Sequence, residues 1–197
     1  MLTILLARRA AIADPQTFQD YNFAIEIPAD WKMLQPPPPQ TLAAFQATNG
    51  LKSIIVIATK IPAKERSIAA RDMVAGAKQS MIDKGWQIIN EHDTTLGGLP
   101  FHAFTTRVSE IASMVTYIGV TRDEGYSLSG ACKTCDASSD PNVMAIINSF
   151  HLLSPKGIPT ESTPEYQFGS RLGLLIVLAL VGVGVVRFLR KKTKTQR

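Results

Sequence analysis

Reactive residue types are scarce in this chain of 197 residues, which holds two cysteines, three histidines and 7% aromatic residues. Two cysteines are too few for a disulfide scaffold. The histidines, His92, His102 and His151, are too scattered for a local metal-ligand motif. No nucleophile elbow, zinc-protease motif or glycine-rich phosphate loop occurs. We therefore assign no catalytic residue, metal ligand or cofactor, and expect a protein that is not an enzyme.

Acidic residues are missing from the C-terminal end, and this explains the formal net charge of +5. Residues 187–197 contain no acid and carry the bases Arg187, Arg190, Lys191, Lys192, Lys194 and Arg197. The stretch from Asp14 to Pro155 has 11 bases against 14 acids, so the body of the protein is slightly acidic. A body of this charge gives no electrostatic support for nucleic-acid binding, and we expect no nucleic-acid partner.

A long apolar run stands directly before this basic tail. Leu172–Val186 contains no charged side chain, and Arg187 can extend toward the headgroups, so the span reaches residue 189. About 18 residues at about 1.5 Å each match the thickness of the bilayer core. The alternative, a buried core helix, is disfavoured because this run has no polar face and a basic cluster follows it directly. We predict a transmembrane helix over 172–189 in contact with the lipid bilayer.

Flanking charge predicts the orientation of that helix. The positive-inside rule places the basic tail, residues 190–197, in the cytoplasm and the domain outside it. Residues 1–13 resemble a truncated signal segment, because Ala11-Ile12-Ala13 looks like a cleavage site although the apolar run before it is short. The alternative is a cytoplasmic domain on a C-terminal tail anchor. Residues 14–155 then form one domain, and residues 156–171 a flexible juxtamembrane spacer.

Strand patterns dominate the predicted domain. The proline run at residues 36–39 predicts an exposed loop, because proline cannot donate ladder hydrogen bonds. Alternating or β-branched stretches predict strands at Tyr21–Pro28, Trp31–Leu34, Leu42–Ala47, Ser53–Thr59, Trp86–Thr95, Pro100–Ser109, Ile111–Thr121 and Glu124–Ala131.

Two helices interrupt the strands. The first is expected to be capped by Ser67 and to stop at Gly85, and the second to start at Pro141 behind an Asp140 cap. Since hairpins link most strands, the predicted class is α+β with a largely antiparallel sheet.

A Gly97-Gly98 turn sets the register of the longest predicted hairpin. Paired residue numbers then sum to 195, so Asp93 faces His102. Such a cross-strand pair is either a functional site or an ordinary polar contact at the surface, and both interpretations stay open.

Several segments resemble the PsbP-like superfamily, which includes the PsbP subunit of photosystem II, Mog-type Ran-release factors and DcrB-like exported proteins. Phe23–Trp31 has the pattern F-x-apolar-x-apolar-P-x-x-W, and further likenesses are Gly98–Phe104, Tyr126–Ser129 and the closing helix Val143–Phe150. The resemblance spans residues 21–153. It implies a twisted, mainly antiparallel sheet sandwiched between helices and a non-enzymatic accessory role. It carries no functional residue across, because the matching positions are structural.

Cys132-Lys-Thr-Cys135 is the sharpest chemical feature of the sequence. Alternation along the preceding strand points Cys132 into the core, and an oxidising compartment permits a disulfide. A redox site would place the first cysteine at a helix N-terminus, whereas the helix here starts near Pro141. A structural disulfide, two buried thiols, and a redox or metal role all stay open.

Together these patterns predict a membrane-anchored, non-enzymatic, extracytoplasmic interaction or accessory domain. Its expected partners are the lipid bilayer and another envelope or membrane protein. The alternative is a thiol–disulfide redox protein that uses the Cys132–Cys135 pair.

Overall fold

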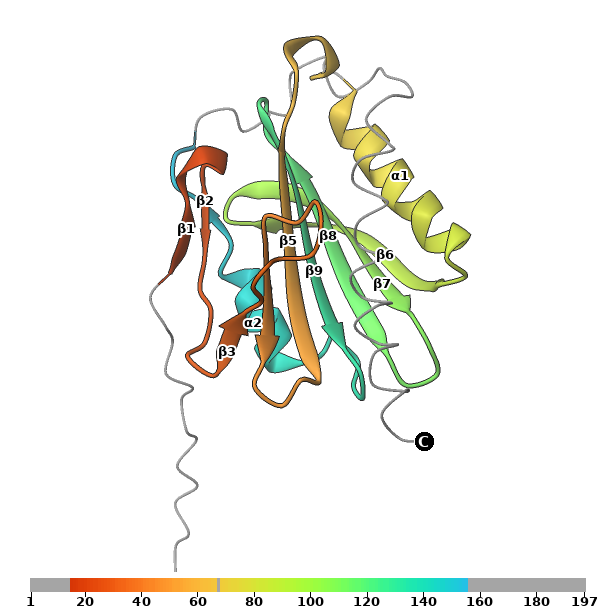
Figure 1. The fold of residues 1–197 in the computed structure, drawn as a ribbon. Helices are drawn as coiled ribbons and strands as arrows, with labels where there is room; N and C mark the ends of the chain where they lie inside the picture. Colours follow the sequence, from red (N-terminus) through yellow and green to blue (C-terminus); the bar gives the residue numbers. More distant parts are fainter. Residues whose placement is uncertain (1–14, 67, 156–197) are drawn as a thin grey trace, which may run out of the picture.

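Antiparallel strands form most of the computed structural model, which describes residues 15–66 and 68–155 (Figure 1). A seven-stranded sheet has the order β3-β4-β5-β9-β8-β7-β6, and each neighbouring pair is antiparallel. Its strands are β3 (Trp31–Met33), β4 (Ala43–Ala47), β5 (Lys52–Lys60), β6 (Gln87–Leu96), β7 (Leu99–Arg107), β8 (Ser113–Val120) and β9 (Glu124–Cys132). The long strands agree with the predicted hairpins to within two residues at most ends.

A second, three-stranded sheet has the order β1-β2-β10. Its members are β1 (Gln16–Phe18), β2 (Phe23–Ile25) and β10 (His151–Leu152), and two short 3₁₀ helices, η1 (Gln19–Tyr21) and η2 (Ala63–Glu65), complete the connections. β1 and β10 have no counterpart among the predicted strands. They are too short to show a period, and β10 forms only because the end of the domain returns to β2, whose Ala24 pairs with His151.

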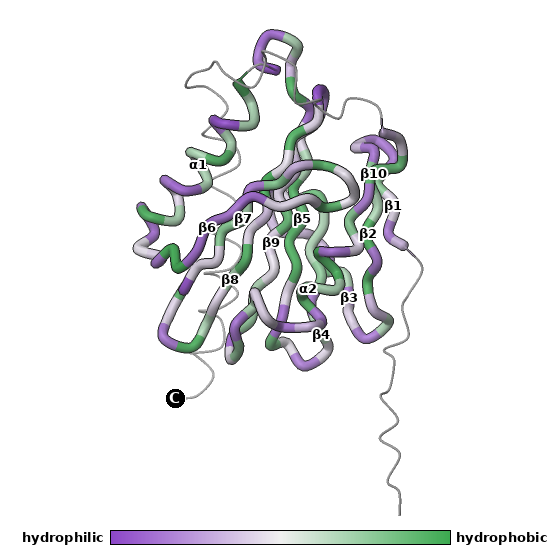
Figure 2. The backbone as a smooth tube through the Cα atoms, turned by 180° about the vertical axis from the view of Figure 1, so that it is seen from behind, coloured by the Kyte–Doolittle hydropathy of each residue, from purple (hydrophilic) through white to green (hydrophobic). Residues whose placement is uncertain are grey.

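The large sheet separates two hydrophobic layers. Helix α1 (Ala69–Asp83) covers one face, and helix α2 (Pro141–Asn148) lies with the small sheet on the other (Figure 1). The central strands β5 and β8 are largely hydrophobic, whereas β6 carries many hydrophilic residues (Figure 2). This layering confirms the predicted antiparallel sheet between helices.

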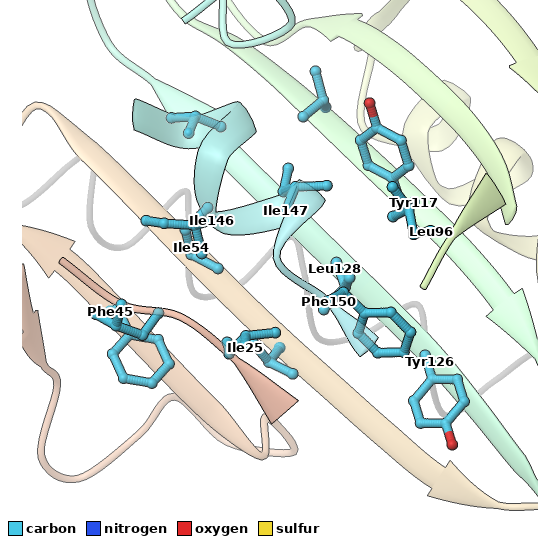
Figure 3. Close-up of a cluster of buried hydrophobic side chains, with 14 of the residues drawn as sticks. Ile25, Phe45, Ile54, Leu96, Tyr117, Tyr126, Leu128, Ile146, Ile147 and Phe150 are labelled. Carbon is cyan, nitrogen blue, oxygen red and sulfur yellow. The ribbon is translucent and has the colours of Figure 1, made fainter. Parts of the chain in front are cut away.

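One aromatic side chain joins the two sheets on the α2 face. Phe150 lies two residues after the end of α2 and is 1% exposed. Its ring contacts three others, with centroid distances of 5.4 Å to Phe23, 5.2 Å to Phe101 and 5.4 Å to Tyr126. Figure 3 shows Phe150 and Tyr126 among the buried aliphatic side chains of this layer. The small sheet is therefore held to β7 and β9 by side chains far apart in sequence.

The turn between β6 and β7 reaches the same junction. Gly97 and Gly98 both have positive φ, as a two-residue hairpin of this kind requires. A Cβ atom at Gly97 would lie 2.6 Å from the carbonyl oxygen of Phe150, so glycine is also needed for close approach. The register is the predicted one, with paired numbers summing to 195 from Leu96 back to Asn90, and a bulge follows at Ile89.

Three local predictions need correction. The strand expected over Tyr21–Pro28 is only Phe23–Ile25, and all three residues are buried, because this strand lies inside the small sheet and does not alternate between core and solvent. The proline loop is only partly exposed, since Pro37 and Pro38 are half-buried. α1 begins at Ala69 behind Ile68, which makes no side-chain cap, and Ser67 lies outside the described residues.

The predicted membrane segments also lie outside the described residues, at 1–13, 156–171, 172–189 and 190–197. Within residues 15–66 and 68–155, no helix is long and apolar enough to span a membrane.

Replacing Phe150 tests whether this aromatic junction stabilises the domain. We expect Phe150→Ala to lower the free energy of unfolding by about 3–5 kcal/mol, because it removes a fully buried ring and leaves a cavity. Leu153→Ala is the control, since Leu153 is 43% exposed and should change stability by about 0.5 kcal/mol or less. Urea denaturation of the purified full-length chain measures both. Equal, small losses in the two variants would contradict the role of the junction.

Candidate functional site

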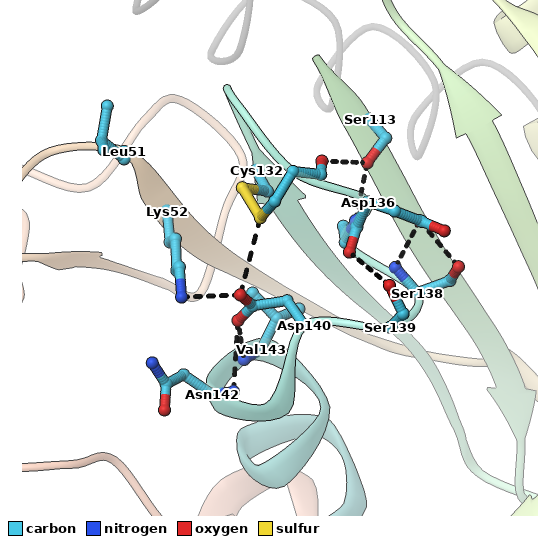
Figure 4. The surroundings of a disulfide bond; sticks show 12 residues. Leu51, Lys52, Ser113, Cys132, Asp136, Ser138, Ser139, Asp140, Asn142 and Val143 are labelled. Carbon is cyan, nitrogen blue, oxygen red and sulfur yellow. Dashed lines mark hydrogen bonds and ion pairs between the residues drawn. A yellow bond between two sulfur atoms is a disulfide. The ribbon is translucent and has the colours of Figure 1, made fainter. Parts of the chain in front are cut away.

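Cys132 and Cys135 lie at the end of β9, where the chain turns toward α2 (Figure 4). Their sulfur atoms are at disulfide-bonding distance and their Cα atoms are 5.4 Å apart. Cys132 is 1% exposed and packs in the α2-side core, as its alternation along β9 predicts, whereas Cys135 is half-buried. The structure thus brings together the two cysteines that the sequence singled out.

Backbone and hydroxyl contacts fix the loop that carries Cys135. Ser113 of β8 donates its hydroxyl to the carbonyl oxygen of Cys135 at 2.9 Å and accepts from the backbone N–H of Ala137 at 2.7 Å. The backbone N–H of Lys133 donates to the carbonyl oxygen of Leu51 at 3.0 Å. The disulfide is therefore one of several ties that hold this loop to the strands beside it.

Asp140 connects this loop to the start of α2. One carboxylate oxygen accepts from the backbone N–H groups of Asn142 and Val143, at 3.1 and 3.0 Å, and so provides the predicted N-cap. The other oxygen lies 2.6 Å from Nζ of Lys52 and 3.5 Å from Sγ of Cys135 (Figure 4). The sequence suggested the cap but not the ion pair, because Lys52 is 88 positions away and only the sheet brings it close.

Two opposing effects set the pKa of Asp140. Burial opposes ionisation of its carboxyl group, which is only 9% exposed. The ion pair with Lys52 and the N–H groups of Val143 and Asn142 outweigh that cost, so the pKa of Asp140 lies below its ordinary value. The carboxylate is accordingly a stable anion beside the disulfide and a poor proton acceptor at neutral pH.

The positions of the two sulfur atoms affect what the pair can do chemically. An external thiolate reaches the half-buried Cys135 more readily than the buried Cys132. Attack at Cys135 would release Cys132 as a thiolate into apolar surroundings, and such burial disfavours the charged form. This arrangement suits a structural cross-link better than rapid thiol–disulfide exchange.

A second polar group lies on β6 and β7, where the hairpin register places Asp93 opposite His102. Nδ1 of His102 is 2.6 Å from the Asp93 carboxylate. Glu91, two residues earlier on β6, lies 4.0 Å from Nε2 of His102 and accepts from Nζ of Lys78 of α1 at 2.8 Å. Hydrogen bonding to Lys78 holds the pKa of Glu91 below its ordinary value. Lys78 and Glu91 extend the predicted pair into a network of four groups.

Exposure limits the catalytic prospects of this network. The side chain of Asp93 is 88% exposed and that of Glu91 is 42% exposed. Catalytic groups are usually perturbed by burial, which these carboxylates lack. Within residues 15–66 and 68–155, no group of three histidine, cysteine, aspartate or glutamate side chains has a metal-binding arrangement. The network therefore presents charge at the surface of the sheet.

Substitution of Asp140 tests the contacts around α2. We expect Asp140→Ala to cost about 2 kcal/mol at pH 7, because it removes the cap and leaves Lys52 without its carboxylate. Asp140→Asn should cost less, since asparagine also caps helices. Because the folded-state pKa is lowered, this stabilisation is present above the ordinary Asp pKa of about 3.9 and is lost as the pH falls through the folded value.

Thermal and urea unfolding at pH 7 and pH 3 measure these differences. Asp136→Asn is the matched control, because Asp136 is an exposed acid of the same loop whose side chain accepts hydrogen bonds from Ser138. A loss in Asp136→Asn as large as that in Asp140→Ala would contradict the assignment.

Comparison with known proteins gives a fold but no close relative. No protein-family model matches the chain, and no curated protein matches its sequence. The chain is similar to the solution structure of cyanobacterial PsbP (CyanoP) from Synechocystis sp. PCC 6803, with a TM-score of 0.53 and 13% identity. That match covers 77% of this chain and 98% of CyanoP.

A crystal structure from Bacteroides thetaiotaomicron VPI-5482 has a TM-score of 0.46 and 12% identity, over 68% of this chain and 46% of that one. This chain thus spans about half of the Bacteroides protein, and the likeness is too low to add to the fold assignment. At 13% identity the CyanoP match shows the fold alone. The described part of this chain has a PsbP-like fold, as the resemblance in its sequence predicts.

Proposed function

We propose that this chain is a membrane-anchored, non-enzymatic interaction module whose PsbP-like domain lies outside the cytoplasm. The observation that carries the proposal is the apolar run Leu172–Val186 followed by six bases and no acid. A single span of this length is a sufficient anchor, and the basic tail suits the anionic inner face of a membrane. Its partners would be the lipid bilayer and another envelope or membrane protein.

The positions of the polar residues in the described domain support an interaction role. Asp140 and Lys52 stabilise a helix start and a loop, and the Asp93–His102 network is open to solvent. Such groups fit a domain that offers a stable surface to a partner. The alternative, a thiol–disulfide redox protein, is favoured by one observation, the half-buried sulfur of Cys135 within a Cys-x-x-Cys pair.

Protease accessibility tests the orientation. In intact spheroplasts, we expect added protease to digest the domain at residues 14–155, while an epitope placed after residue 197 is protected. After detergent lysis both should be digested, and a cytoplasmic marker protein serves as the control for intact membranes. A fully protected domain would overturn the extracytoplasmic location and favour the tail-anchored alternative.

Replacing both cysteines by serine separates the module from the redox protein. We expect the Cys132→Ser/Cys135→Ser variant to lose about 2 kcal/mol of stability, because a short cross-link restricts the unfolded chain only modestly. The native chain should accelerate dithiothreitol-driven insulin reduction no more than this variant does. Acceleration by the native chain that the double variant abolishes would overturn the module in favour of the redox protein.

A further inference from the structure

The two edges of the large sheet differ in how they are protected. At one edge β3 has only three residues and leads into the proline run at 36–39, and both features discourage pairing with another strand. At the other edge β6 has ten residues, seven of them exposed, and among the described strands it pairs with β7 alone (Figure 1). β6 is therefore a long strand with one open side.

The register shows which backbone groups face that open side. In an antiparallel hairpin closed by two residues, the pair next to the turn, Leu96–Leu99, exchanges backbone hydrogen bonds, and every second pair before it does the same. The residues between, Glu91, Asp93 and Thr95, then direct their N–H and C=O groups away from β7. The backbone N–H and C=O groups of these three residues are therefore oriented to pair with an added strand.

Charge along the open side indicates what kind of strand fits. Glu91, Asp93 and Thr95 share the α1 face of the sheet, since side chains two apart lie on one face. Lys78 already neutralises Glu91, but the Asp93 side chain is 88% exposed and keeps carboxylate surface for a new partner. An incoming strand places alternate side chains directly opposite these positions, where lysine or arginine is favoured and acidic residues are not.

Charge disfavours two registers in which β6 would pair with a second copy of itself. Antiparallel pairing of β6 with itself, centred on residue 92, places Glu91 opposite Asp93 of the copy, and centring on residue 93 places the two Asp93 side chains opposite each other. Like charges directly opposite destabilise a sheet. The bulge at Ile89 further limits regular pairing to the segment from Asn90 onward. The same features leave Asn90–Leu96 open to a partner of opposite charge.

We propose that β6 is a docking strand, onto which an extended basic segment of a partner protein adds as an eighth strand of the large sheet. Backbone hydrogen bonds to Glu91, Asp93 and Thr95 supply the affinity, and a lysine or arginine side chain faces the exposed Asp93 carboxylate. This inference rests on the proposed interaction function and deepens it, because it names the surface and the chemistry of the partner.

A synthetic probe tests the docking strand on the full-length chain in lipid nanodiscs. The probe is a fluorescein-labelled, end-blocked peptide of nine residues in which lysine and valine alternate, and its binding is followed by fluorescence anisotropy at 0.15 M salt. We expect saturable binding that Asp93→Lys weakens about tenfold or more, since an opposed like charge replaces an attractive pair. Glu110→Lys is the matched control, because Glu110 is an exposed acid on the β7–β8 turn and undergoes the same change of charge, and it should leave the affinity unchanged.

A second peptide distinguishes strand addition from simple charge attraction. It has the same sequence with N-methyl groups on the backbone nitrogens of its lysine residues, and we expect it to lose binding because those nitrogens can no longer donate to the edge. Equal binding of the two peptides, an unchanged affinity in Asp93→Lys, or no saturable binding up to 1 mM peptide would each overturn the proposal. Unchanged thermal unfolding of Asp93→Lys shows that the variant is folded.

Two further measurements, of self-association and of protease accessibility, test the identity of the strand's occupant and the location of the domain. Self-association of the chain that Asp93→Lys abolishes would make a second copy the occupant and overturn the basic-segment assignment. Protease protection of the domain in spheroplasts, together with specific peptide binding, would overturn the extracytoplasmic location and support the docking strand. Absence of peptide binding with an accessible domain would overturn the docking strand alone.

Discussion

Packing of Phe150 against three other rings is the interaction on which the rest of the domain depends. The ring lies between Phe23 of the small sheet and Phe101 and Tyr126 of the large one. Around it, Gly97 brings the β6–β7 turn against the Phe150 backbone, and Ser149 accepts from the backbone N–H of Glu26 at 2.8 Å. Because segments from both ends of the domain meet here, the small sheet, α2 and the long hairpin keep their places together.

That junction also sets the position of the two polar regions. α2 precedes Phe150, so its capping residue Asp140 is held beside the disulfide and can reach Lys52 on β5. The hairpin that turns at Gly97 carries Asp93 on β6 to the far edge of the sheet, where its side chain faces solvent. The region around Asp140 is largely buried and stabilises the fold, whereas the region around Asp93 is exposed to solvent. A binding role is therefore inferred only for the region around Asp93.

Much of the fold could be predicted from periodicity and turn residues. The Gly97-Gly98 turn fixed the register that pairs Asp93 with His102, and Asp140 with Pro141 marked the start of α2. The small sheet could not be predicted, since β1 and β10 are three and two residues long and β10 depends on pairing across more than 120 positions. The Lys52–Asp140 ion pair could not be predicted either, because its two residues are 88 positions apart in the sequence.

The sequence by itself determined the local features: hairpin register, the Asp140 cap, the core-facing side of Cys132, and an apolar run with a basic end that predicts an anchor. Each depends on neighbours within a few residues, where backbone geometry leaves few choices. Only the tertiary structure decided which strands became edges and which carboxylates paired with cations. Those properties arise from contacts between distant segments, and no local pattern encodes them.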